Sequence, residues 1–508
     1  MALLSAAAVA LLACSRNSSS SASSEPEDAG PDVGRAVTAD GRLPDHPRSL
    51  PFEYVRPDVG APLTDAEISV ATTQYLDILA QTHWFKTTAE RVHGWPETDP
   101  RGRYWYGTWW TGVRALREGG KVTYLHSPDG ADNNGLRTAQ LAEGACYAHT
   151  LWGSAEIEHL LRRLMRGVAS WFFAMERGAD DLSYRMARAA YPEAVVSNEM
   201  PLPLYIDYGA NRPGNDGATA YYVHLPANPS WPDLWVRNMR SKDDIGHLLR
   251  ALGELDTCDG HFRDARAEDD LVELRRRFQG FSQRTRDNGW VIETLDRDQN
   301  VVLPSEGLAR FITLFECGAL LTMEMVADRD PIDVDCGDGY DPGVEGIDAI
   351  KSSAMQVARS FHVGAVQQAL LHARPDLAQK LQQGVAKRLD TVMDLIDKGK
   401  PPANFGTGDL VAFLLHAAHA GIPLTSREVR FLHGRIAEAH ASYTSPARAN
   451  DFRLFAVDAP DGEYSYEPGG SGIDWKDLGL VLGLCAAQYR NPNGRVAVDC
   501  DSIRRFTP

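Results

Sequence analysis

Two short polar segments contain the residue types that acid–base chemistry requires. Their members are Asp132, Asn133, Asn134, Asp243, Asp244 and His247. Two carboxyl groups can serve as acid and base when their surroundings separate their pKa values. A glycosidase places such a pair across the scissile bond, whereas a lyase needs a base and a group that neutralises a uronate. Asp132, Asp243, Asp244 and His247 are therefore the catalytic candidates. The structural alternative is that the aspartates only cap helices.

Aromatic residues crowd the segment from Tyr104 to Trp110, which includes Trp105, Trp109 and Trp110. Flat indole faces stack on sugar rings, and the same faces fill the space between packed helices. Both interpretations stay open. The candidate substrate-binding residues are Asn133, Asn134, Arg137, Trp105, Trp109 and Trp110.

Six aspartates fall within the fourteen residues from Asp328 to Asp341. Clustered carboxylates with glycine turns can bind calcium, and Asp333, Asp335 and Asp338 are the candidate ligands. The alternative is a solvated acidic loop. No cofactor is otherwise indicated.

Four histidines, His416, His419, His433 and His440, recur at helical spacing. We interpret them as core or interfacial residues, since no HExxH arrangement accompanies them. Polar loops are expected at 207–217 and 461–470, either over a cleft or at the plain surface. No GxSxG, phosphate-binding or dinucleotide-binding motif is present.

The chain has 508 residues, of which 43% are hydrophobic and 24% charged, with a net charge of −17. This charge argues against a nucleic-acid partner. Short arginine clusters occur at Arg162–Arg163 and Arg275–Arg277, which we interpret as solvated helix faces.

The N-terminal segment predicts export. Residues 2–13 are apolar and end in Leu11-Leu12-Ala13-Cys14, followed by a serine-rich run. This ending resembles the lipobox of bacterial lipoproteins. The resemblance implies a signal peptide at 1–13, acylation of Cys14 with palmitate-type chains, and a cell-envelope location, with Ser15 favouring the outer membrane. The alternative is an apolar tail on an intracellular protein.

The remaining six cysteines permit up to three disulfide bonds in an exported protein. Cys485 with Cys500 is the preferred pair, because it would tie the C-terminal tail to the last helix. Cys146 lies in an apolar helical pattern and is interpreted as a buried thiol.

Residues 14–60 have the Ser/Pro-rich composition of a disordered tether, and the folded domain is predicted over 61–508. Thr64 to Glu67 resembles an N-terminal capping box. Roughly a dozen helices are expected in all, including 180–190, 305–326 and 474–488, together with one strand pair over 291–303. We predict an all-α fold, an (α/α)6 toroid of helical hairpins with one small β-hairpin.

A family resemblance supports this fold. Asp132-Asn133-Asn134-Gly135-Leu136-Arg137-Thr138-Ala139 is similar to a motif that opens an early helix in exported bacterial α/α-toroid proteins, with Arg137 in place of the usual tryptophan. Arg240-Ser241-Lys242-Asp243-Asp244-Ile245-Gly246-His247 resembles their later "S-x-D-x-x-x-G-H" signature. Toroids of this kind are common among enzymes that cleave or modify polysaccharides, so this resemblance and the lipobox together imply a lipid-anchored protein that binds, and as an enzyme cleaves or modifies, a polysaccharide. The rival hypothesis is a non-catalytic surface lipoprotein that binds a glycan or a protein.

Overall fold

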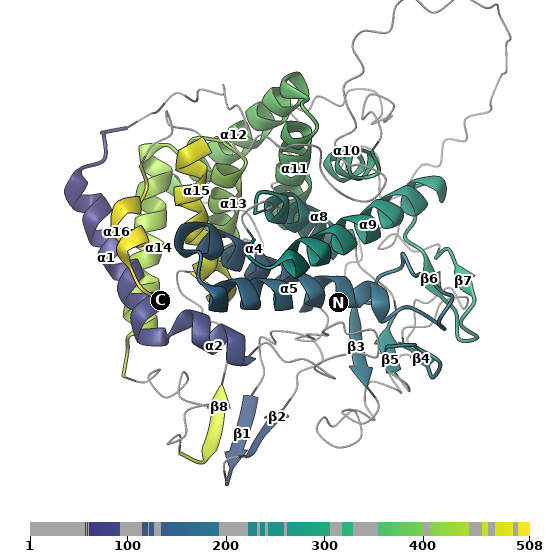
Figure 1. The fold of residues 1–508 in the computed structure, drawn as a ribbon. Coiled ribbons are helices and arrows are strands. Elements are labelled where there is room, and N and C mark those ends of the chain that lie inside the picture. The colour runs from purple at the N-terminus through teal and green to yellow at the C-terminus, as the bar shows by residue number, and fades with distance from the viewer. Residues whose placement is uncertain are drawn as a thin grey trace, which may run out of the picture. The chain divides into compact units, whose positions relative to one another are not determined.

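The computed structural model describes residues 56, 58, 60–91, 114–119, 121–125, 134–192, 222–230, 234–238, 242–258, 262–304, 317–328, 354–399, 407–446, 460–465, 473–490 and 496–508. All of them belong to one compact unit that extends from Arg35 to Pro508. Helices dominate this unit, as the sequence predicted (Figure 1).

The helices, in chain order, are α1 (Asp65–Thr82), α2 (Trp84–Arg91), α4 (Asn134–Trp152), α5 (Ala155–Phe173), α8 (Lys242–Asp256), α9 (Ala265–Asp287), α10 (Cys317–Val326), α11 (Ala354–Leu371), α12 (Pro375–Asp397), α13 (Thr407–His419), α14 (Ser426–Tyr443), the 3-10 helix η4 (Trp475–Leu482), α15 (Gly483–Arg490) and α16 (Cys500–Arg505). The strands are β1 (Arg114–Glu118), β2 (Lys121–Leu125), β3 (Ala189–Pro192), β4 (Tyr222–Leu225), β5 (Leu234–Arg237), β6 (Thr294–Leu295), β7 (Val301–Val302) and β8 (Gly462–Ser465).

Five helical segments contact one another in a closed cycle. α4 packs on α8, α8 on α11, α11 on α13, α13 on η4, and η4 returns to α4. The return contact is close: a Cβ atom on Gly144 would lie 2.8 Å from the Cα of Gly479. Glycine at both positions therefore lets the two backbones touch.

Further helices pack against this cycle. α5 lies on α4, α12 on α11, α14 beside α1, and α9 on α5 and α10. In Figure 1, α1 and α14 lie at one flank and α9 and α10 at the other, with α4, α8, α13 and α15 between them.

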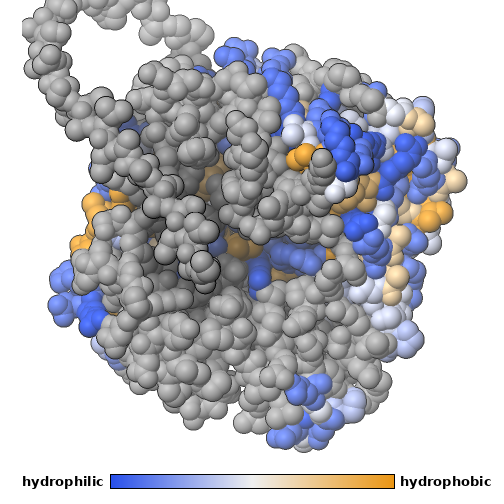
Figure 2. All heavy atoms as spheres, turned by 180° about the vertical axis from the view of Figure 1, so that it is seen from behind, coloured by the Kyte–Doolittle hydropathy of each residue, from blue (hydrophilic) through white to orange (hydrophobic). Residues whose placement is uncertain are grey.

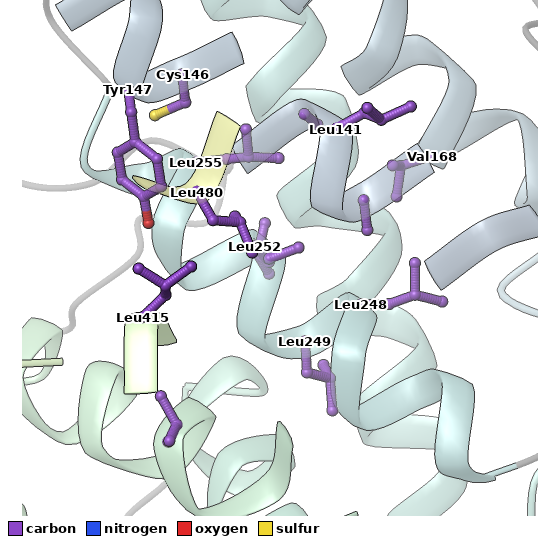
Figure 3. Close-up of a cluster of buried hydrophobic side chains, with 14 of the residues drawn as sticks. Leu141, Cys146, Tyr147, Val168, Leu248, Leu249, Leu252, Leu255, Leu415 and Leu480 are labelled. Carbon is purple, nitrogen blue, oxygen red and sulfur yellow. The ribbon is translucent and has the colours of Figure 1, made fainter. Parts of the chain in front are cut away.

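The apolar core lies where the helices of the cycle meet. Figure 3 shows leucines from four of these segments converging: Leu141 of α4, Leu248, Leu249, Leu252 and Leu255 of α8, Leu415 of α13 and Leu480 of η4. Each is at most 3% exposed. Burying a leucine contributes roughly 1.5–3 kcal/mol, so this cluster is a main source of contact energy between the helices.

The face drawn in Figure 2 is mostly polar where its residues are described. Figure 2 shows hydrophilic side chains predominating among the described residues of that face, with hydrophobic ones in small groups. Among the described residues, none of the helices has the length and apolar composition needed to cross a lipid bilayer.

Several local predictions are confirmed. The Thr64 hydroxyl accepts from the Glu67 N–H, and the Glu67 carboxylate accepts from the Thr64 N–H, which completes the capping box of α1. β6 and β7 form the predicted hairpin. The disulfide between Cys485 and Cys500 is present, and it joins α15 to α16.

Other predictions are wrong. The segment 180–190 is not a helix: it runs as coil into β3, and the Ala187 N–H donates to the Trp171 carbonyl at 2.9 Å. Two antiparallel sheets, ordered β2-β1-β8 and β3-β5-β4, were not predicted, because their strands show no clear alternation of apolar and polar residues. β8 occupies part of the segment that was expected to be the loop 461–470.

Cys146 is not a free thiol. It forms a disulfide with Cys258 that links α4 to the end of α8, with the two Cα atoms 5.9 Å apart. Cys317 is also disulfide-bonded. Cys14 and Cys336 lie outside the described residues. The helical pattern around Cys146 indicated burial correctly but could not show a partner 112 residues away.

The arginine clusters are solvated only in part: the Arg276 side chain is 48% exposed, but three of the other arginines are buried in ion pairs. Arg162 pairs with Asp264 and Asp270, Arg275 with Asp256, and Arg277 with Glu176. Arg162, Arg275 and Arg277 are each at most 7% exposed. Their acidic partners lie on other segments of the chain, so helical periodicity alone could not predict that these arginines are buried.

Arg56 fastens the end of the predicted tether to the folded unit. Its guanidinium donates to both carboxylate oxygens of Glu428, at 2.6 and 2.8 Å, and to Asp390 at 2.7 Å. Burial disfavours the charged form, but Glu428 and Asp390 outweigh it and raise the pKa of Arg56. Nearby, Asp58 accepts from the N–H and hydroxyl of Ser426 at the start of α14.

We expect Arg56→Met to lower the free energy of unfolding by about 3–5 kcal/mol, because it leaves the Glu428 carboxylate buried without its cation. Chemical denaturation followed by circular dichroism measures this change. Arg430→Met is the matched control, because Arg430 lies on α14 together with Glu428. It breaks an exposed pair with Glu67 and exposed hydrogen bonds to the Ala61 and Pro62 carbonyls, and should cost less than Arg56→Met. Equal losses for the two variants would contradict this account of Arg56.

Candidate functional site

The N-terminal ends of three helices bring charged side chains together. Arg137 lies in the first turn of α4 and Asp244 in the first turn of α8, while Asp477 lies at the start of η4 and Asp474 directly precedes that helix. The carboxylates that act electrostatically on Arg137 are Asp474, Asp244 and Asp477. Residues from separate parts of the chain thus form one group, which we call the charged cluster: Arg137, Arg188, Asp244, Asp474, Lys476 and Asp477.

Helix geometry explains the convergence of Arg137 and Asp244. Farther along the same helices, Arg250 of α8 donates to both oxygens of Glu143 of α4, at 2.8 and 2.7 Å. Arg137 precedes Glu143 by six residues, and Asp244 precedes Arg250 by six. At 1.5 Å per residue, both lie about 9 Å above the same salt bridge. The Cys146–Cys258 disulfide lies beyond this salt bridge on both segments, so the two helices run in the same direction and present both side chains at one level.

Each carboxylate of the charged cluster lies closer to another basic side chain than to Arg137. The Lys476 ammonium lies 2.6 Å from Asp474 and 3.3 Å from Asp477. Burial opposes the charge on Lys476, but Asp477 and Asp474 outweigh it, so the pKa of Lys476 is raised. The Arg188 guanidinium lies 3.8 Å from Asp244.

Arg137 has no such direct partner among the residues that the structure describes. Within the described part of the chain its buried Nη1 makes no hydrogen bond, and no ion pair to it is formed there. Burial lowers the pKa of Arg137 to about 10, against the opposing effect of Asp474, Asp244 and Asp477. The guanidinium therefore remains charged at neutral pH, and the carboxylates of Asp474, Asp244 and Asp477 favour that charge without forming a direct ion pair with it.

A second polar group lies deeper on the same face of α4. Gln140, one helical turn after Arg137, is 1% exposed, and its Oε1 makes no hydrogen bond within the residues described here. A buried acceptor without a donor is unfavourable by about 1–3 kcal/mol.

Below the charged cluster, a buried ionic network joins the helices of the cycle. Glu143, which is fully buried, accepts from Arg250 and lies 3.0 Å from the Nε2 of His416 of α13. Next to it, the Tyr147 hydroxyl lies 2.8 Å from Nδ1 of His419, whose Nε2 lies 3.0 Å from the Leu480 carbonyl. We call Glu143, Tyr147, Arg250, Glu254, His416 and His419 the polar hub.

Glu254 extends the polar hub toward α11. It lies 3.9 Å from His419 and accepts a hydrogen bond from Gln367. Because these carboxylates are fully buried, they hold helices in register rather than meet a large ligand.

The interpretation of the four histidines as core or interfacial is confirmed. His416 and His419 are at most 1% exposed. His433 bonds the Ala497 carbonyl, and His440 bonds Asp77 of α1. No group of three or more metal-ligating side chains occurs among the described residues.

The structure places only some of the residues that the sequence singled out. Arg137, Asp244 and His247 are described, and His247 is 2% exposed one turn after Asp244. Asn134 begins α4 and Asp243 lies in the first turn of α8, but their side chains are not described. The remaining candidates lie outside the described residues: Cys14, Trp105, Trp109, Trp110, Asp132, Asn133, Asp333, Asp335 and Asp338, with the loop 207–217.

The sequence analysis did not predict the third helix start that contributes to the charged cluster, the start of η4. Asp474, Lys476 and Asp477 surround Trp475 immediately before an apolar run. That run of charges at a helix start was the available signal, but it was interpreted only as the entry to the last helix.

Comparisons with known proteins give no relative. No family model, no curated protein and no solved structure matches this chain.

We expect Glu143→Gln to lower the free energy of unfolding by about 3–5 kcal/mol, since it leaves Arg250 buried without its anion. Urea denaturation measures the change. Glu438→Gln is the control, because Glu438 is 41% exposed and pairs with Arg435 on the same helix. A loss at Glu143 no larger than at Glu438 would show that the polar hub does not carry the fold.

Proposed function

We propose that this protein is an exported lipoprotein whose helical unit binds a polysaccharide at the charged cluster. The observation that carries the proposal is the convergence of Arg137, Asp244 and Asp477 from three helix starts. Polar groups that meet at the ends of several helices are a common way to build a ligand site on a rigid scaffold.

A toroid is the proposed architecture. A closed cycle of contacts through α4, α8, α11, α13 and η4 is what such a ring requires, and outer helices alternate with these segments along the chain. Within the described residues the cycle passes through five segments, whereas six hairpins were predicted. Parallel inner helices with their N-terminal ends at one side also fit this proposal.

The mixture of charges favours a polar, hydroxyl-rich ligand. Arg137, Arg188 and Lys476 are donors, while Asp244, Asp474 and Asp477 are acceptors. A sugar presents both kinds of hydrogen-bonding group around each ring. An extended apolar ligand would instead leave these charges desolvated without compensation.

Binding without catalysis is the form of the proposal that this geometry supports best. Asp244 and Asp477 are at most 2% exposed and already lie beside Arg188 and Lys476. The enzyme hypothesis requires an acid and a base that reach the bond to be broken. It makes Asp244 and His247 the first residues to test, together with Asp243 and Asp132.

We expect the purified chain to deplete a soluble polysaccharide from solution, and Asp244→Asn to weaken this binding about tenfold or more, because charge-assisted hydrogen bonds are lost. Affinity electrophoresis across a glycan panel measures binding. Chromatography of the same mixtures detects products. Asp269→Asn on the exposed side of α9 is the control.

Three outcomes separate the hypotheses. Binding without product supports the proposal, and product that disappears in Asp244→Asn selects the enzyme. If no glycan binds, or if Asp244→Asn binds like the control, the proposed site is wrong.

The lipoprotein part has its own test. We expect the full chain, expressed in a bacterium that processes lipoproteins, to incorporate a palmitate analogue, and Cys14→Ala to incorporate none, because the acyl chains attach to that sulfur. In-gel detection of the label measures this. Cys336→Ala should label like the wild type. Equal labelling of Cys14→Ala and wild type would contradict the anchor.

A further inference from the structure

We propose that the disulfide between Cys485 and Cys500 is a redox latch for the C-terminal segment, residues 496–508, which we call the C-terminal strap. A protein dithiol that reduces this bond releases the strap from the helices that it covers. α16 forms the middle of the strap and lies against α1 (Figure 1). The strap shares no residue with the charged cluster, so the latch does not depend on the proposed function.

Hydrogen bonds join the C-terminal strap to three helices. The Ala497 carbonyl lies 2.6 Å from Nε2 of His433 on α14. The Asp499 N–H donates to the Thr72 hydroxyl of α1 at 2.9 Å. The Ile503 carbonyl accepts from the indole N–H of the last residue of α4 at 3.0 Å. The strap thus bridges segments that lie far apart in the sequence.

Apolar side chains of the strap pack between these hydrogen bonds. Val498 and Ile503 are fully buried. The Phe506 ring packs on Trp152 of α4 with the ring centroids 6.0 Å apart, and the Trp152 ring in turn lies 5.3 Å from that of Phe85 of α2. Release of the strap therefore exposes apolar surface on α2 and α4.

The strap has too little local structure to stay in place by itself. α16 has six residues, fewer than an isolated helix needs to be stable in water. Fixing the backbone of one residue costs an amount of free energy similar to what burying one aliphatic side chain gains. The strap orders every residue from 496 to 508 but fully buries only a few aliphatic side chains. The disulfide offsets the difference, because it closes a loop with a sequence separation of 15 and keeps the strap beside its site.

Access distinguishes this disulfide from the one between Cys146 and Cys258. Cys500 is half-buried, whereas Cys146, Cys258 and Cys485 are 0% exposed. Thiol–disulfide exchange requires a thiolate to reach one of the two sulfur atoms. A reductant can therefore approach Cys500 on the folded protein, but it can approach the Cys146–Cys258 bond only when the core opens.

The exchange balances in two steps. A thiolate of the dithiol attacks the Cys500 sulfur, the sulfur–sulfur bond breaks, and its electron pair leaves on Cys485, which takes up a proton. The second thiol of the dithiol loses its proton and attacks the mixed disulfide, which displaces the Cys500 sulfur as a thiolate that is protonated in turn. The latch gains two electrons and two protons, and the dithiol becomes a disulfide.

The first test measures which disulfide opens on the folded chain. The oxidised full-length protein is equilibrated with increasing dithiothreitol, trapped with acid, alkylated in denaturant and mapped by peptide mass spectrometry. We expect Cys485 and Cys500 to be alkylated at a dithiothreitol concentration about tenfold or more below the one that opens the Cys146–Cys258 bond. Opening of both bonds together, or of the core bond first, would overturn the proposal.

The second test measures the release of the strap by hydrogen exchange and mass spectrometry. After selective reduction, the amides of residues 496–508 should exchange about tenfold or more faster, while those of α14 should keep their protection. The double variant Cys485→Ser with Cys500→Ser should exchange like the reduced wild type. The same variant is the control for the reagent, because dithiothreitol should not change the exchange of its strap further.

Three results of the exchange experiment would contradict the latch. If the strap keeps its protection after the bond is reduced, the bond does not hold it in place. If α1 and α14 lose protection together with the strap, the bond supports the whole fold and is not a local switch. If dithiothreitol further loosens the strap of the double variant, another disulfide controls its release.

Discussion

The burial of the Glu143 carboxylate is the constraint on which the rest of the structure depends. A carboxylate that is fully removed from water must find cations or donors, because its desolvation is costly. Glu143 finds Arg250 on α8 and His416 on α13. Leucines on the same helices supply most of the contact area, but they tolerate small slips in register. The ionic contacts do not, so the polar hub fixes how the helices are aligned.

That alignment connects the polar hub to the candidate site. Arg137 and Asp244 each stand six residues from the Glu143–Arg250 salt bridge, so a rigid pair of helices carries the alignment to the helix starts. The Cys146–Cys258 disulfide links the same two helices on the other side of that bridge. The contact between Gly144 and Gly479 then brings η4, with Asp477, to the same place. The charged cluster is thus held from below by three independent contacts.

The sequence predicted what is local and missed what is distant. The capping box at Thr64 and the strand pair β6–β7 depend on neighbours within a few residues, and both were predicted correctly. The Cys485–Cys500 pair was found because only a short tail separates the two cysteines. Helical periodicity also identified most helices, since it follows from which face of each helix is buried.

Long-range partners were beyond this kind of inference. Arg277 has the same local pattern as a solvated arginine, and only the approach of Glu176 explains its burial. His416 and His419 were correctly assigned to the interior, but Glu143 and Glu254 could not be assigned to them from helical spacing. For the candidate site, Arg137 and Asp244 were found from two separate motifs. Asp477 was missed because nothing local distinguishes a ligand site from a charged helix start.

The most direct test of the central claim is a double-mutant cycle between Glu143 and Arg250, with each residue replaced by leucine singly and together, and the unfolding free energies measured in urea. If the salt bridge holds α4 against α8, each single variant strands a buried charge and the double variant strands none. The coupling energy should then be about 2 kcal/mol or more. Losses that add to within about 0.5 kcal/mol would show that the two residues act independently and that the polar hub does not organise the fold.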